Sequence, residues 1–92
     1  MAITYDSVKQ ELTLLHRGLD MARAGEIFDG PTITVTDDRR DYGETRYISI
    51  GELDERMVVV VWTPRAATRR IISLRKANDH EQKIYGKRLG RP

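Results

Sequence analysis

The chain has 92 residues, of which 39% are hydrophobic and 33% are charged, and its formal net charge is +2. This length predicts one domain over residues 1–92 and excludes two separate cores, because each would bury too little apolar surface to fold. The absence of cysteine excludes a disulfide framework, a thiolate nucleophile and a zinc site built on cysteine.

The beginning of the chain predicts a cytoplasmic protein. Residues 1–6 lack the basic region and the apolar stretch of a signal peptide. The longest apolar run, residues 57–62, is far too short to span a bilayer. We therefore expect neither secretion nor membrane insertion.

Two helices are expected in the first third of the chain. Ser7 fits the first position of a capping box that opens a helix over residues 7–16, before Gly18. A second helix, capped by Asp20, is expected to run to about Phe28. The apolar residues of the first helix recur at i, i+4 and i+7, as one stripe of an amphipathic helix: Val8, Leu12 and Leu15.

Four strands should follow. The segments 32–36 and 46–50 alternate apolar and polar residues, which is typical of half-buried strands. Residues 57–62 are apolar on both faces, so they predict the most covered, central strand. Residues 68–75 are expected to form the fourth strand, and the short connections favour antiparallel pairing.

A last helix should begin at Asn78, because Glu81 three residues later completes a capping box. The order of elements predicts an α+β, two-layer fold: two N-terminal helices, a four-stranded mainly antiparallel sheet and a C-terminal helix. One face of the sheet would then remain for solvent, a ligand or a partner.

The charges are unevenly distributed along the chain. Residues 62–92 carry nine Lys/Arg against two acids, whereas residues 26–56 carry nine acids against four bases. A basic end beside strands is the electrostatic pattern expected of a protein that binds a polyanion such as nucleic acid.

Strand alternation assigns candidate roles to the arginines near the end of the chain. In the fourth strand, Arg69 and Arg75 fall on one face, and Arg70 on the other. We expect Arg69 and Arg75 to point from the open face, with Lys76 at its edge and Arg65 on the preceding loop. Arginine suits phosphate because its planar fork donates two parallel hydrogen bonds. A single arginine of this kind is as often only a solvated strand residue.

Tyr85 lies four residues after Glu81, so the two share one face of the last helix. A phenol there can stack on a base or handle a proton, although docking of the helix onto the sheet through Tyr85 is the simpler interpretation. Metal chemistry has little support, because the acids at 37, 38 and 41 are interleaved with arginines in a turn. Phosphate-binding glycine loops and the nucleophile motif G-x-S-x-G are also absent.

Several segments together resemble the BrnT family of toxins. They are H-R-G-L-D at 16–20, E-I-F-D-G-P at 26–31, D-R-R-D-Y-G-E at 38–44, V-V-V-V-W-T at 58–63 and R-R-I-I-S-L-R-K-A-N at 69–78. The first helix of that family usually ends in N-x-x-K-H-G, where this chain has Thr13, His16 and Arg17 before Gly18.

The resemblance implies a type II toxin–antitoxin system. Its toxin would be a small, RelE-like, metal-independent endoribonuclease without a cofactor, which cleaves RNA and inhibits translation and growth. Its antitoxin would be a BrnA-type ribbon-helix-helix protein, and the pair would bind operator DNA through the antitoxin. On this resemblance, the expected catalytic residues are Arg69, Arg75, Tyr85 and Glu81, and the expected RNA-binding residues are Lys9, Arg65, Arg70 and Lys76.

Two alternatives use the same basic face without catalysis. A nucleic-acid-binding module would hold RNA intact with strong salt dependence. A partner-binding module would instead meet an acidic segment of another protein.

Overall fold

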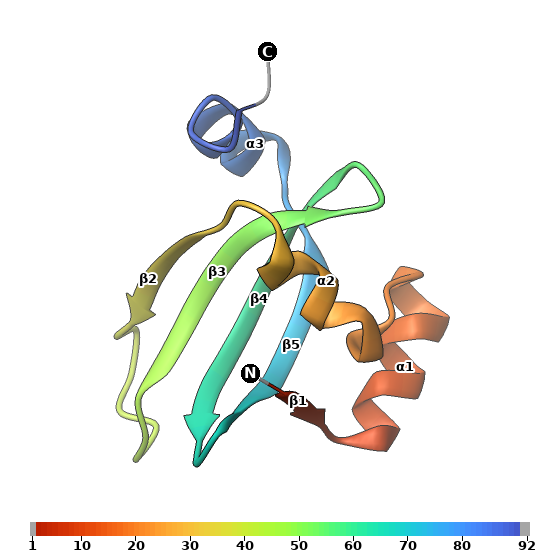
Figure 1. The fold of residues 1–92 in the computed structure, drawn as a ribbon, viewed down its shortest axis with the longest axis vertical. Coiled ribbons are helices and arrows are strands. Elements are labelled where there is room, and N and C mark those ends of the chain that lie inside the picture. Colours follow the sequence, from red (N-terminus) through yellow and green to blue (C-terminus); the bar gives the residue numbers. More distant parts are fainter. Residues whose placement is uncertain (1, 91–92) are drawn as a thin grey trace.

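The structure, a computed structural model, describes residues 2–90 and consists of one curved, five-stranded mixed sheet with three α-helices (Figure 1). The strands lie in the order β1-β5-β4-β3-β2. In chain order the elements are β1 (Ala2–Tyr5), α1 (Ser7–Arg17), a 3-10 turn η1 (Met21–Arg23), α2 (Ala24–Asp29), β2 (Ile33–Asp37), β3 (Arg46–Leu53), β4 (Arg56–Arg65), β5 (Thr68–Lys76) and α3 (Asp79–Tyr85).

The expected four-stranded, mainly antiparallel sheet is wrong, because the chain begins with a strand. Ala2–Tyr5 pairs in parallel with the start of β5, where Ala2 faces Thr68 and Tyr5 faces Ile71. Four residues are too few to display a period, and the partner strand lies far along the chain. Only the tertiary fold brings these two segments together.

The expected pair of N-terminal helices is also corrected. The first helix forms as predicted, but the second begins as the 3-10 turn η1, in which the Asp20 side chain accepts from the backbone N–H of Ala22 at 2.9 Å. The following α2 is only six residues long. The polypeptide between Gly18 and Gly30 is therefore a compact turn and a short helix instead of one continuous helix.

The helix ends follow local capping chemistry. Asp6, one residue before the expected Ser7, caps α1 by accepting from the backbone N–H of Lys9 at 3.0 Å. Gly18 ends α1 in the left-handed conformation, at φ 68°. The predicted capping box of the C-terminal helix α3 is confirmed, since Asn78 and Glu81 each bond the other's backbone N–H.

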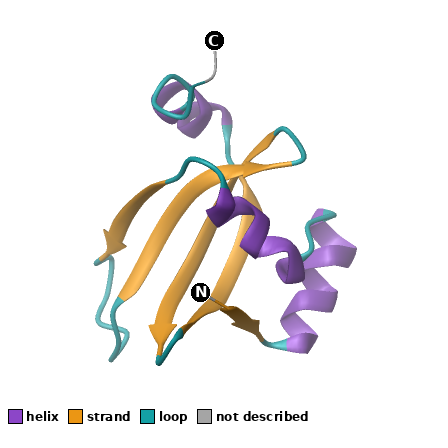
Figure 2. Ribbon diagram, viewed as in Figure 1, coloured by secondary structure: helices purple, strands orange, loops and turns teal. Residues whose placement is uncertain are grey.

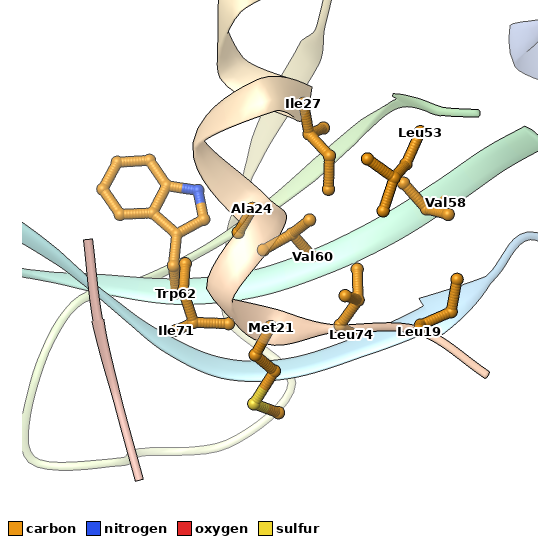
Figure 3. Close-up of a cluster of buried hydrophobic side chains, with 10 residues drawn as sticks. All are labelled: Leu19, Met21, Ala24, Ile27, Leu53, Val58, Val60, Trp62, Ile71 and Leu74. Carbon is orange, nitrogen blue, oxygen red and sulfur yellow. The ribbon is translucent and has the colours of Figure 1, made fainter. Parts of the chain in front are cut away.

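The main core lies between the sheet and the segment formed by η1 and α2, which cross one face of the sheet (Figure 2). Figure 3 shows Met21, Ala24 and Ile27 of this segment directed toward side chains of β4 and β5. The strand side chains of this cluster include Val58, Val60, Trp62, Ile71 and Leu74. We call this side of the sheet the helix-covered face.

A smaller core, which we call the α3-side core, lies on the opposite side, at the end of the sheet where α3 docks. Ile50, Met57 and Val59 pack there with Ala77 and Leu89, and Tyr85 is partly buried against them. Within residues 2–90, no helix covers the rest of this side (Figure 1). We call it the open face.

A β-bulge between β4 and β5 decides which side chains reach each face. Val61 pairs with Ser73 but its neighbour Trp62 pairs with Ile71, so Ile72 is the extra residue. The bulge shifts the alternation of β5 by one position. Consequently Ile71 and Leu74, three residues apart, both enter the main core.

Candidate nucleic-acid interface

Arginines from three strands share the open face. Paired residues of antiparallel strands point to the same side, so the buried partners identify the face of each strand residue. Arg75 pairs with Val59 of the α3-side core, and Arg70 pairs with Thr63, which lies on the same side as Val59. By the same alternation, Arg46 of β3 and Arg65 of β4 also belong to this face.

Arg75 is held in place by Glu81. Its Nη1 lies 2.7 Å from Oε1 and its Nη2 lies 2.8 Å from Oε2 of the Glu81 carboxylate. This two-point hydrogen bond raises the pKa of Arg75, while burial and the neighbouring charge of Arg39 oppose the shift. The same contact lowers the pKa of Glu81 to about 2. The Arg75 side chain nevertheless stays 43% exposed, so a ligand can reach it.

A second anchored guanidinium comes from the loop between β2 and β3. Arg39 donates to both carboxylate oxygens of Asp37, at 2.7 Å and 2.8 Å, and Tyr42 donates to the same carboxylate at 3.1 Å. The Asp37 side chain is only 1% exposed, whereas that of Arg39 is 66% exposed. Arg39 holds the pKa of Asp37 well below its usual range, so the carboxylate fixes a cation that faces solvent.

The end of the open face that lies away from α3 is also basic. Glu44 lies 3.4 Å from Arg65 and 4.0 Å from Arg46, which joins cations from β4 and β3. The guanidinium of Arg46 stacks over the ring of Tyr42, 4.1 Å from its centroid. Between the two ends of the face lie half-buried Ile48 and Val61.

The expectation that Arg69 and Arg75 share a face is wrong. Arg69 stacks over Phe28 at 4.2 Å and over Trp62 at 5.1 Å, on the helix-covered face. The bulge at Ile72 is the reason. Its extra residue reverses the alternation of side chains between the two faces of the sheet, so residues six positions apart no longer point to the same side. Arg70, expected on the opposite side from Arg75, instead lies on the same face as Arg75.

The predicted lysines are not gathered with Arg75. Lys76 pairs with Val58, whose side chain enters the main core, so it belongs to the edge of the helix-covered face. Lys9 lies on α1 and lines a hollow with Ile72 and Ser73. Tyr85 contributes to the α3-side core, which supports its role in docking the helix.

Sequence reasoning missed Arg39 and Arg46. The arginines of the 37–44 segment read as solvated turn chemistry, and nothing local indicates that a buried Asp37 carboxylate anchors Arg39. Arg46 had a usable signal, because it lies two and four residues before Ile48 and Ile50 and therefore shares their face of β3. Arg91, one of the nine basic residues at positions 62–92, lies outside the described residues.

Residues 2–90 contain no group of three or more His, Asp or Glu side chains placed to hold a metal ion. Within the same residues, no helix is long and apolar enough to cross a membrane.

The comparison with protein families decides the class of this chain. Residues 5–81 match the family described as the ribonuclease toxin BrnT of type II toxin–antitoxin systems. The chain belongs to the BrnT family. A comparison with individually curated proteins finds no match.

Membership in the BrnT family gives the basic face its context. The family implies an RNA substrate and an antitoxin partner. Its matched segment includes Arg39, Arg70, Arg75 and Glu81, but ends before Tyr85.

Proposed function

We propose that this BrnT chain is a metal-independent endoribonuclease that cleaves RNA on its open face and so inhibits translation and growth. We further propose that a BrnA-type ribbon-helix-helix antitoxin neutralises it, and that the pair binds operator DNA through the antitoxin. The observation that carries the catalytic proposal is Arg75, an exposed guanidinium oriented at two points by Glu81 on a face lined with further arginines.

The proposed cleavage of RNA needs only a few functions from the protein. Cleavage of RNA without a metal uses the 2′-hydroxyl as nucleophile against the adjacent phosphorus, and the 5′-oxygen leaves with a proton. The enzyme must orient the phosphate, stabilise the charge of the phosphorane and accept the hydroxyl proton. Arg75 supplies the charge stabilisation, and the charge of Arg39 near it adds to the field.

Glu81 acts in this proposal as a positioning residue. Both of its carboxylate oxygens are occupied by Arg75, and a pKa of about 2 makes it a weak proton acceptor. Tyr85, one turn farther along α3, remains the candidate to orient or deprotonate the 2′-hydroxyl. A site without a poised histidine would depend mainly on electrostatics and orientation.

The remaining arginines of the open face bind the RNA backbone. Arg70 and Arg65, with Arg46 and Arg39, offer planar forks suited to successive phosphates. Lys9 and Lys76 lie away from this face and contribute only to the general field. Arg69 is not assigned to catalysis, because it lies across the sheet from Arg75.

One experiment separates the candidate functions. Purified chain is incubated with RNA in EDTA, and the products are resolved beside those of Arg75→Ala. Cleavage by the wild type and intact RNA with the variant support the proposal. Shifted but intact RNA would indicate a non-catalytic binding module, and RNA that neither shifts nor breaks would indicate a partner-binding module.

A further inference from the structure

The helix α1 has its apolar side turned away from the protein. Its stripe of Val8, Leu12 and Leu15 is strongly exposed, at 62%, 50% and 76%. Four of the six strongly exposed large apolar side chains among residues 2–90 lie on this one helix. Solvent-exposed apolar residues gathered in this way mark a surface that a partner covers.

The polar side of α1 makes the contacts with the rest of the domain. Gln10 donates to Asp20 at 2.9 Å, and Arg17 donates to the carbonyl of Leu74 in β5 at 2.9 Å. No residue of α1 is buried, and only Gln10 and Thr13 are half-buried. The amphipathic helix expected from the sequence is therefore present, but its apolar stripe does not contribute to the core of this chain.

A hollow beside the stripe adds positive charge. It lies between α1 and the part of β5 that extends beyond β1, and no acidic side chain of the described part of the chain lines it. The residues around it are Lys9, Leu12, Thr13, His16, Arg17, Met21, Ile72 and Ser73. An occupant of stripe and hollow together would present apolar side chains flanked by carboxylates.

We propose that the antitoxin docks on α1, through an amphipathic segment that covers the stripe and places acidic side chains in the hollow. This inference rests on the proposed function for the existence of the antitoxin, but not for the cleavage chemistry. RNA is a poor occupant, because phosphates gain nothing from Val8 or Leu15. A second copy is disfavoured, since a twofold contact would bring the same cations of the hollow together.

The stripe and hollow of α1 are separate from the open face. The α1 helix lies beyond the β5 edge, on the side of the helix-covered face (Figure 1). Docking there anchors the antitoxin without contacting Arg75. Binding of the antitoxin and cleavage of RNA can therefore be altered independently.

The test uses the paired substitution Val8→Glu and Leu15→Glu in the full chain, with the cognate antitoxin as the probe. Both side chains are exposed, so the fold should persist, and Val8→Ser with Leu15→Ser provides a milder variant. Ile84→Glu is the matched control, because Ile84 is an apolar residue of α3 that is 47% exposed. Affinity is measured by titration calorimetry, and RNA cleavage is measured in parallel.

We expect the paired α1 variant to bind the antitoxin at least about thirtyfold more weakly, as removal of a central apolar contact does. Ile84→Glu should stay within about threefold of the wild type. In cells, the α1 variant should escape neutralisation while retaining its toxicity. Loss of antitoxin binding in a chain that cleaves no RNA would sink the proposed activity but leave the docking surface intact.

Two results would overturn the inference. One is an α1 variant that binds the antitoxin as tightly as the control does. The other is a wild-type dimer that the α1 variant breaks while antitoxin binding is unchanged, which would assign the stripe to a second copy. The acidic character of the partner is tested by Lys9→Glu, which should weaken binding and reduce its salt dependence; an unchanged affinity would contradict it.

Discussion

Arg75 at the end of β5 and Glu81 in the first turn of α3 form a two-point ion pair, with both nitrogen–oxygen distances below 2.9 Å. Glu81 also accepts from the backbone N–H of Asn78 as part of the α3 capping box. One carboxylate thus joins the start of a helix to the arginine proposed to stabilise the transition state. The position of α3 and the orientation of Arg75 are coupled through it.

Replacing Arg75 by Ala should lower the rate of RNA cleavage by a factor of about 100 or more, because a charged donor aimed at the phosphorane is lost. The folded structure should persist, since the side chain is 43% exposed. Cleavage rates and melting temperatures are to be measured beside Arg56→Ala, which removes an exposed arginine at the start of β4. A folded Arg75→Ala chain that cleaves at the wild-type rate would rule out this role.

Replacing Arg69 by Met should affect stability more than cleavage. The guanidinium of Arg69 stacks on Phe28 and Trp62, so its loss removes packing on the helix-covered face. We expect a cost of about 1 kcal/mol in the free energy of unfolding, measured by denaturant titration. The cleavage rate should stay within about threefold of the wild type; a drop as large as that of Arg75→Ala would place Arg69 in the active site after all.

Replacing Glu81 by Gln should reveal the pH dependence of the ion pair. The folded-state pKa of Glu81 is about 2, below its ordinary value of 4.5, so its charge stabilises the fold fully above pH 4.5 and progressively less as the pH falls toward 2. Because the pair is partly exposed, we expect about 1 kcal/mol at pH 7, or roughly 4–8 °C in melting temperature. Melting curves of the two proteins should converge only as the pH falls below the folded-state pKa of about 2, and a difference that persists there would contradict the assignment.

Replacing Gly51 by Ala should destabilise the domain. An added Cβ would lie 2.7 Å from Cγ2 of Ile27 and 3.1 Å from Cγ2 of Thr32, where α2 crosses β3. Overpacking of this kind costs about 1–3 kcal/mol, measurable by urea unfolding.

The same contact allows a check by double substitution. Ile27→Leu removes the branch at Cβ that the new methyl group would meet. The double variant should therefore lose less free energy of unfolding than the sum of the losses of Gly51→Ala and Ile27→Leu. If the two losses of free energy are simply additive, α2 moves aside and Ile27 does not clash with the new methyl group.

Much of the local structure could be read from the sequence. The capping role of Asp20, the capping box of Asn78 and Glu81, the alternation of residues 46–50 and the apolar run at 57–62 all depend on neighbouring residues. Their conformations follow from capping, periodicity and chain stiffness, which act over a few positions. The basic end and the family motifs are likewise properties of the linear chain.

The tertiary structure alone decided where the functional residues lie. Pairing of β1 with β5 joins segments that are far apart in the chain, and the bulge at Ile72 shifts the register between β4 and β5. A single extra residue reverses the side-chain alternation, which is why Arg69 and Arg75 are separated by the sheet. The periodicity of α1 predicts an apolar stripe but not its direction, which was settled by the contacts of Gln10 and Arg17 with the rest of the domain.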